Sequence, residues 1–224
     1  MDVISKDLLK QFVYMDSKVN LYAPDGSFEI PLSMTAAKLY SPVIKTALES
    51  PLSVSNGDQK DDSYESRITR SIAGSQGKKE SKQVTSQLSG GNLRRIKVDE
   101  FDGKTVQIFI RCLQGQIDDT EVKSFDWKCV MEILKMFHFY EVDHMYDIFL
   151  KQAIQLMSNE LIVEAVHFME IYGFQESWCT RMVDLLYNNP ATFNTQEWKD
   201  SILKCPHTQS RLQAFYIKRK LGYG

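Results

Sequence analysis

The segments VMEILKMFHFYEVDHMYDIFLKQAIQL (residues 130–156) and VEAVHFMEIYGFQESWCTRMVDLLYNN (residues 163–189) share one pattern. In each, an apolar run with helical spacing reaches a tyrosine, crosses a short break and continues into a second helical run. Alignment of the two copies places Tyr140 on Tyr172. Each segment therefore predicts a helical hairpin. If the shared pattern arises by chance, the same helices are still predicted.

Apolar side chains recur at i, i+3 and i+4 through the first hairpin, as they do on one face of an α-helix. The members of this stripe are Trp127, Val130, Met131, Leu134 and His138 before the break, and Met145, Ile148, Phe149, Ala153 and Leu156 after it. One hairpin cannot bury such a stripe alone, and two copies are too few for a repeat array. We therefore expect the first hairpin to pack on another part of the chain.

The composition allows one compact domain or two small ones. Apolar residues make up 43% of the chain, and the formal net charge of -2 gives no overall attraction for nucleic acid or acidic lipid. No apolar run approaches the ~20 residues of a membrane helix. The first residues, MDVISKDLLK, lack the apolar core of a signal peptide. We expect a protein of the nucleus or cytoplasm that is not secreted and does not enter a membrane.

The chain before the hairpins alternates between helical and extended patterns. Residues 3–13 predict a short helix, and the turn PDG between KVNLYA and SFEI predicts a β-hairpin. Residues 33–50 predict two short helices, because Pro42 would break one helix but suits the first turn of a new one. RRIKV then predicts a strand, and Asp102 is a suitable cap for the next helix. The apolar face predicted for that helix consists of Val106, Phe109, Ile110 and Leu113.

Residues 51–93 differ in composition from the rest of the chain, with nine serines, five glycines and no Phe or Trp. Such a segment buries too little apolar area to offset the entropy of ordering, so we expect a disordered insertion. Without it, the predicted order is strand, strand, helix, helix, strand, helix and two helical hairpins. A small sheet covered by helices accommodates this order and provides the surface that the first hairpin needs. The predicted fold class is therefore α+β.

Three stretches, in this order, resemble the BTB/POZ domain family. SPVIKTALE is similar to the segment in which a Ser-Pro pair opens the family's second helix. IKVDEFDGKTVQIFIRCLQGQ resembles its next strand and helix, and ILKMFHFYEVDHMYDIFLKQAI resembles its closing pair of helices. The resemblance implies a BTB/POZ domain over residues 1–157. The second hairpin and NPATFNTQEWKDSILKCPH resemble the helical extension of the speckle-type POZ proteins, which implies a 3-box or BACK-like extension over residues 158–224.

Two positions depart from the family pattern. Lys18 or Asn20 stands where the family usually has Asp in its first strand, and Ser33-Met34 replaces a His-Lys pair. In the family these residues form a charged pocket at the homodimer seam, so self-association stays an open alternative. FEIPLSMTAAKLYSPVIKTALE also resembles the Skp1-type branch of the fold, which does not form that dimer. Both branches remain open.

The resemblance implies a non-catalytic protein-protein interaction module, and our main hypothesis is a substrate adaptor of a cullin 3-RING ubiquitin ligase. The alternative is a scaffold that binds a specific protein partner without cullin or ubiquitin transfer. Family members that bind cullin 3 place an apolar residue in a cullin pocket, with Glu two positions later. Here Leu48 and Glu49 are adjacent, and Leu48 could instead pack in the core. The candidate partner-binding residues are Leu48, Glu49, Leu52, Tyr140 and Tyr146.

Catalytic and cofactor patterns are not evident. Neither a nucleophile elbow nor a phosphate-binding glycine loop is present, and the paired acids Asp118-Asp119 fall in a predicted solvated turn. The cysteines and histidines are scattered over separate segments, which favours reduced structural thiols over a metal site. They are Cys112, Cys129, Cys179, Cys205, His138, His144, His167 and His207. We expect no enzyme, no cofactor, no metal and no small-molecule substrate.

Two basic stretches are further candidates for binding. In the insertion, Arg67 and Arg70 follow an acidic patch and would meet a phosphate added nearby, although a solvated spacer is the alternative. In the tail, Lys218, Arg219 and Lys220 form a weak nuclear address or a solvated helix end. Affinity for nucleic acid grows with the number of phosphate contacts, so we do not expect nucleic-acid binding.

Overall fold

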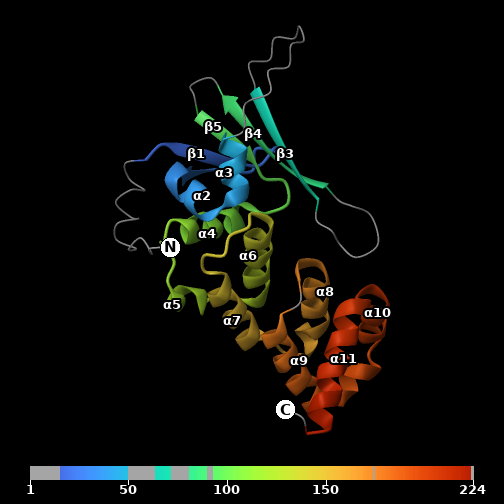
Figure 1. Cartoon of the computed structure of the whole chain (residues 1–224). Helices are drawn as coiled ribbons and strands as arrows, with labels where there is room; N and C mark the ends of the chain where they lie inside the picture. Colours follow the sequence, from blue (N-terminus) through green and yellow to red (C-terminus); the bar gives the residue numbers. More distant parts are fainter. Residues whose placement is uncertain (1–15, 50–63, 72–80, 90–92, 174, 223–224) are drawn as a thin grey trace. The chain divides into compact units, whose positions relative to one another are not determined.

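The computed structural model describes residues 16–49, 64–71, 81–89, 93–173 and 175–222. Its contacts divide the chain into two compact units, Met1–Phe149 and Leu150–Gly224. The division falls within α7 (Tyr146–Leu156), whereas the sequence analysis placed the domain boundary after residue 157. The fold is mixed α+β, as predicted, with a sheet and helices in the first unit and helices in the described part of the second (Figure 1). The helix predicted over residues 3–13 lies outside the described residues.

The sheet of the first unit has five strands in the order β2-β1-β5-β4-β3 (Figure 1). β1 (Lys18–Tyr22) and β2 (Glu29–Ser33) form an antiparallel hairpin, and β5 (Leu93–Lys97) runs parallel to β1. The predicted hairpin and the strand predicted at RRIKV are therefore confirmed. The core side chains of these strands, all fully buried, are Val19, Leu21, Leu32 and Ile96.

The expectation of a disordered insertion is wrong for two of its segments. β3 (Tyr64–Ser71) and β4 (Ser81–Ser89) pair with each other in antiparallel fashion, and β4 pairs with β5. The register sets Ile68 opposite Val84. The composition of residues 51–93 did not indicate these strands. A segment with little apolar area can still form a strand when the edge of an existing sheet supplies its backbone hydrogen bonds. The other parts of the predicted insertion, residues 51–63, 72–80 and 90–92, lie outside the described residues.

α2 (Met34–Tyr40) and α3 (Pro42–Glu49) are the two short helices predicted on either side of Ser41. Ser33 caps α2, since its hydroxyl accepts a hydrogen bond from the Ala36 N–H. Pro42 begins α3, where a missing N–H removes no helical hydrogen bond. α3 lies beside β3 and β4. Its buried residues are Val43, Ile44, Ala47 and Leu48.

α4 (Gly103–Leu113) begins after Asp102, as predicted. The Asp102 carboxylate accepts a hydrogen bond of 2.9 Å from the Thr105 N–H. This hydrogen bond is the main cause of a lowered pKa at Asp102. The apolar face predicted for the helix is buried, and its members are Val106, Phe109, Ile110 and Leu113.

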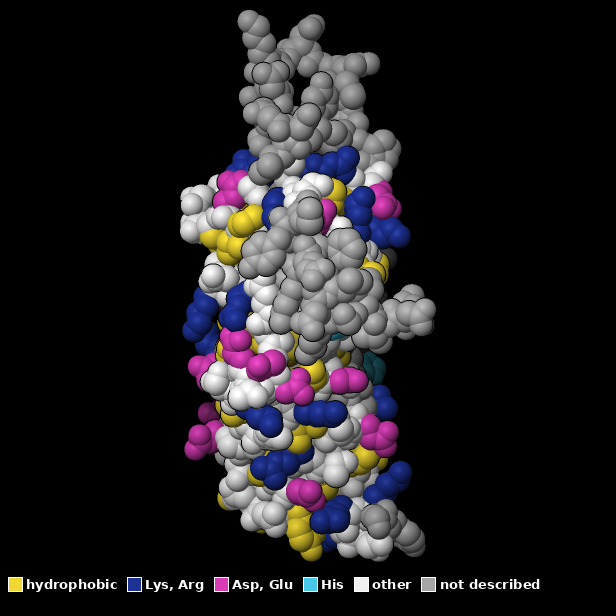
Figure 2. All heavy atoms as spheres, turned by 90° about the vertical axis from the view of Figure 1, so that its left-hand side faces the viewer, with side chains coloured by type: hydrophobic (Ala, Val, Ile, Leu, Met, Phe, Trp, Pro, Cys, Tyr) yellow, Lys and Arg dark blue, Asp and Glu magenta, His cyan; other side chains and the backbone are white. Residues whose placement is uncertain are grey.

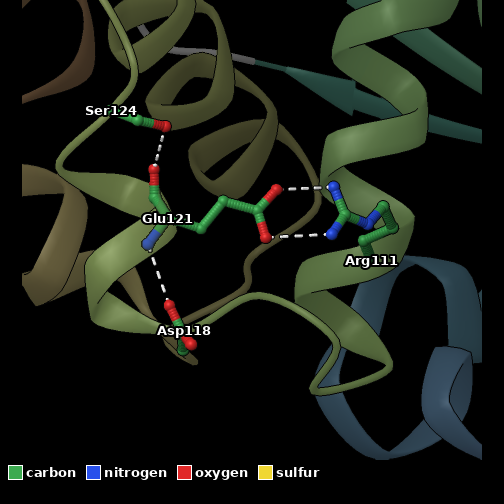
Figure 3. Close-up of polar contacts among 4 residues, drawn as sticks. All are labelled: Arg111, Asp118, Glu121 and Ser124. Atoms are coloured by element: carbon green, nitrogen blue, oxygen red, sulfur yellow. Dashed lines mark hydrogen bonds and ion pairs between the residues drawn. The ribbon is translucent and has the colours of Figure 1, made fainter.

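Asp118 and Asp119 are exposed, as predicted, and they begin a single helical turn, α5 (Asp119–Val122). Asp118 caps it by accepting a hydrogen bond of 2.8 Å from the Glu121 N–H. The Glu121 carboxylate in turn accepts two hydrogen bonds, of 2.6 and 2.9 Å, from Arg111 of α4 (Figure 3). A bidentate pair of this kind fixes orientation as well as distance, so it attaches the short turn to α4.

α6 (Trp127–Phe139) and α7 are the helices predicted for the first hairpin. Phe149 in α7 is fully buried, and its ring meets that of Phe137 edge-on with 5.3 Å between centroids. The Phe125 ring lies 6.1 Å from the Phe149 ring in a stacked arrangement. The stripe predicted on α6 is buried except at His138, which is partly exposed.

The described part of the second unit beyond α7 is helical throughout. Its elements are η1 (Asn159–Leu161), α8 (Ile162–Tyr172), α9 (Glu176–Asn188), η2 (Pro190–Asn194), α10 (Gln196–Lys204) and α11 (Pro206–Lys220). α8 and α9 are the helices predicted for the second hairpin, and α11 lies beside α8, α9 and α10. Trp178 of α9 is fully buried, with its ring 5.3 Å from that of Phe168. The second unit thus has an aromatic core of its own.

Phe149→Ala should lower the free energy of unfolding by about 3–5 kcal/mol, because it removes a buried ring and leaves a cavity beside Phe125 and Phe137. Equilibrium unfolding in urea measures this change. Leu39→Ala is the control, since Leu39 is 47% exposed and a surface substitution costs about 0.5 kcal/mol or less. Equal effects at the two positions would show that Phe149 is not part of the core.

Replacement of residues 53–92 with a Gly-Ser linker should preserve cooperative thermal unfolding. The reason is that β1, β2 and β5 keep their mutual pairing, and the closure entropy of a loop changes slowly with its length. The replacement removes β3 and β4, which exposes an edge of β5, so we expect the variant to associate at high concentration. Circular dichroism and light scattering measure the two effects. Loss of the cooperative transition would show that β3 and β4 are required for folding.

Candidate protein-interaction surface

The five residues selected from the sequence as partner-binding differ in exposure. Leu48 and Tyr140 are each 1% exposed and belong to the core of the first unit. Glu49 is exposed at the end of α3, and Tyr146 is partly buried at the start of α7. Leu52 lies outside the described residues. Leu48 therefore takes the alternative role of a core side chain, and neither it nor Tyr140 presents an area that a partner can contact.

A buried hydrogen bond joins the start of α3 to the end of α6. The Ser41 hydroxyl donates to the Tyr140 carbonyl at 2.7 Å and accepts from the Ile44 N–H at 3.1 Å. Ser41 is fully buried, so water does not replace either bond when it is lost. This arrangement places the α6–α7 loop next to the junction of α2 and α3.

The α6–α7 loop has an unusual backbone. Glu141 (φ 53°) and Met145 (φ 64°) both adopt the left-handed conformation, although neither is glycine. The Val142 N–H donates to the Phe137 carbonyl at 2.8 Å and holds the first of these bends. Left-handed non-glycine residues carry a free-energy cost and cluster at binding sites. The loop is therefore a candidate for contact with a partner.

α2 meets this loop through an aromatic stack. The rings of Tyr40 and His144 lie with centroids 4.4 Å apart and planes 22° apart. α2 also reaches the end of α3, where Lys38 Nζ lies 3.7 Å from the Glu49 carboxylate. Because both charged groups are exposed, this ion pair contributes no more than about 1 kcal/mol. We name Tyr40, Glu49, His144 and Tyr146 the α2–loop surface.

The two tyrosines of the α2–loop surface are uncharged at neutral pH. Burial raises the pKa of Tyr40 and that of Tyr146 above the ordinary value for a phenol. Each tyrosine therefore combines an apolar ring with a hydroxyl that donates and accepts hydrogen bonds. Side chains of this kind are enriched at protein interfaces.

Tyr40 and His144 are absent from the residues that the sequence analysis selected. His144 was grouped with ordinary scattered histidines, whereas it lies in the α6–α7 loop and stacks on α2. The available signal was that both residues adjoin predicted breaks, Tyr40 before Ser-Pro and His144 after EVD. A stack between residues so distant in sequence follows only from the fold.

The four cysteine thiols are not activated as nucleophiles. Burial raises the pKa of all four cysteine thiols, to about 12 for Cys179 and about 11 for Cys205. These thiols are protonated and weakly nucleophilic at neutral pH. The described residues include no group of three or more His, Cys, Asp or Glu placed to hold a metal ion.

The face drawn in Figure 2 is mixed in charge. Lys and Arg side chains are interspersed with Asp and Glu on the face drawn in Figure 2, and apolar side chains form small separate areas there. Among the described helices, none is both long and apolar enough to cross a bilayer.

No protein-family model matches the chain, and no curated protein matches it significantly. The resemblance to BTB/POZ domains therefore stays a prediction from the sequence motifs.

Ser41→Ala should lower the free energy of unfolding by about 1–3 kcal/mol, because it leaves the buried Tyr140 carbonyl without its donor. Ser124→Ala is a matched control. The Ser124 hydroxyl also donates to a carbonyl, that of Glu121, but the group is exposed and water replaces the lost bond (Figure 3). Urea unfolding compares the two variants. A smaller loss at Ser41 than at Ser124 would show that the Ser41 bond does not hold α3 to α6.

Proposed function

We propose that this chain is a non-catalytic protein-interaction module of the BTB/POZ type, and that it acts as a substrate adaptor of a cullin 3-RING ubiquitin ligase. The observation that carries the proposal is the arrangement of the first unit. A β-hairpin is followed by two short helices separated at a Ser-Pro pair, and after β3 and β4 a strand parallel to β1 leads to a capped helix. Apart from β3 and β4, this is the order that the resemblance to BTB/POZ domains implies.

The α2–loop surface supports a protein partner for the first unit. It combines the Glu49 carboxylate with two neutral tyrosines and the stacked His144 ring. Aromatic side chains contribute a large share of the binding free energy at many protein interfaces. Leu48 cannot supply the apolar contact because it is buried. Leu39, which is 47% exposed and precedes Tyr40, is the anchor that we propose in its place.

A scaffold that assembles a complex without ubiquitin transfer is the second candidate function. The burial of Leu48 favours it, because cullin-binding members of the family use an exposed apolar residue at this point. In that case the α2–loop surface would bind a protein other than cullin. The two functions differ in a single measurable property, which is affinity for cullin 3.

Calorimetry of the purified chain with the N-terminal region of cullin 3 tests the adaptor proposal. We expect a Kd of about 10 μM or tighter, which corresponds to about -7 kcal/mol. The double variant Leu39→Asp/Tyr146→Ala should weaken binding by at least ~10-fold, since it removes the proposed apolar anchor and an aromatic ring.

Leu203→Asp is the control for this titration, because Leu203 is 83% exposed in the second unit and its replacement should leave Kd unchanged. Circular dichroism establishes that each variant is folded. Absence of heat at high concentration of both proteins would overturn the adaptor proposal and leave the scaffold. Tight binding that survives the double variant would retain the adaptor and reject the α2–loop surface as its site.

A further inference from the structure

A pocket of about 690 Å³ opens in the second unit, where η1 and α8 face η2 and the start of α10. Its lining residues are Asn159, Glu160, Val163, Glu164, His167, Asn189, Ala191, Thr192, Thr195 and Glu197. All of them belong to one unit, so the pocket needs no other part of the chain for its walls. The volume is in the range of ligand sites and larger than one amino-acid side chain.

Among the described residues that line this pocket, three carry carboxylates and none is Lys or Arg. Glu160, Glu164 and Glu197 are exposed, as groups at the mouth of a pocket are. None of the three forms an ion pair or a side-chain hydrogen bond with another described residue. Like charges around one opening repel each other, and a bound cation relieves that repulsion. An anionic ligand such as a phosphate would add to the repulsion.

Two polar atoms of the pocket residues have no hydrogen-bond partner among the described residues. They are Asn159 Oδ1 and His167 Nε2, and both are shielded from water, where an unpaired polar atom is unfavourable. By contrast, the Thr195 hydroxyl is satisfied, because it accepts from the Trp198 N–H and donates to the Thr192 carbonyl. The terminal torsions of Asn and His are broad, so either atom can turn toward a partner without a change of backbone.

We propose that this pocket binds an arginine side chain carried by a basic peptide segment of a protein partner. A guanidinium is planar and always charged, and its five N–H donors suit a bidentate pair with a carboxylate. The remaining donors can pair with Asn159 Oδ1, and with His167 Nε2 in the tautomer that carries the ring proton on Nδ1. The apolar stem of the arginine packs on Val163 and Ala191, and the volume beyond one side chain accepts the neighbouring residues of the segment.

A lysine matches the pocket less well, because its three donors radiate from one atom and do not form a flat fork. The pocket belongs to the second unit, whereas the α2–loop surface belongs to the first. This inference rests on the adaptor proposal when it names a substrate class: the substrates would be proteins with an exposed arginine-containing segment.

Fluorescence anisotropy of the whole chain tests this assignment with the fluorescein-labelled peptide Gly-Ser-Arg-Gly-Arg-Ser-Gly in buffer of about 150 mM salt. We expect saturable binding of this peptide. A peptide with citrulline in place of arginine keeps the shape but loses the charge, and should show no saturable binding. A lysine peptide should bind at least ~3-fold more weakly than the arginine peptide.

Glu164→Gln should weaken binding of the arginine peptide by at least ~5-fold, because it removes a charge-assisted hydrogen bond. Glu176→Gln is the matched control: it removes the same charge from an exposed position of α9 outside the pocket, and should leave the affinity unchanged. Both variants should bind cullin 3 as the unmodified chain does. Failure of the arginine proposal can therefore be distinguished from failure of the adaptor proposal.

Several outcomes would overturn the proposal. These are no binding of the arginine peptide, equal binding of the citrulline peptide, and equal weakening by the two Glu variants, which would indicate a diffuse attraction to acidic surface. Equal affinity for the lysine and arginine peptides would reject the guanidinium as the group that is recognised. A melting curve of each variant excludes loss of fold as the cause of weak binding.

Discussion

The hydrogen bond from the Ser41 hydroxyl to the Tyr140 carbonyl connects residues that are 99 positions apart and lie in the core of the first unit. It holds the junction of α2 and α3 to the end of α6, and the Tyr140 ring packs with its centroid 5.3 Å from that of Phe109 in α4. Helices from three parts of the chain therefore meet at one buried point. Because no water reaches this point, the polar groups there must satisfy each other, which restricts how the helices can be arranged.

A second constraint comes from the parallel pairing of β1 and β5. Parallel neighbours need a long connection, and here that connection carries α2 and α3 as well as β3 and β4. The sheet grows on the β5 side through this connection. On its other side β2 contains Pro31, which donates no backbone hydrogen bond and so makes that edge a poor template for a further strand. The connection thus determines where the sheet extends.

The two units present different chemistry to their surroundings. The α2–loop surface of the first unit offers aromatic rings beside the Glu49 carboxylate, and suits a partner with complementary apolar and hydrogen-bonding groups. The pocket of the second unit has three carboxylates and no Lys or Arg among its described lining residues, and suits a cation.

The sequence by itself determined most of the described helices, the β-hairpin and the strand RRIKV. The signals for these elements act over a few residues, so they can be recognised before the fold is known. Examples are the Asp102 cap, the break at Pro42 and the helical stripe of α6. The mixed α+β class followed from their order. Of the candidate site, the sequence selected Glu49, which is exposed, and Tyr146, which is partly exposed.

Only the tertiary structure decided which elements become neighbours. The strands β3 and β4 form on an existing sheet edge, so their composition alone did not indicate order. The sequence pattern around Leu48 was compatible with an exposed anchor or with a core residue. The packing of α3 buries Leu48 in the core. The Tyr40–His144 stack and the acidic pocket likewise join segments that are separate in sequence. Burial and proximity depend on contacts between distant residues, and a local pattern does not contain that information.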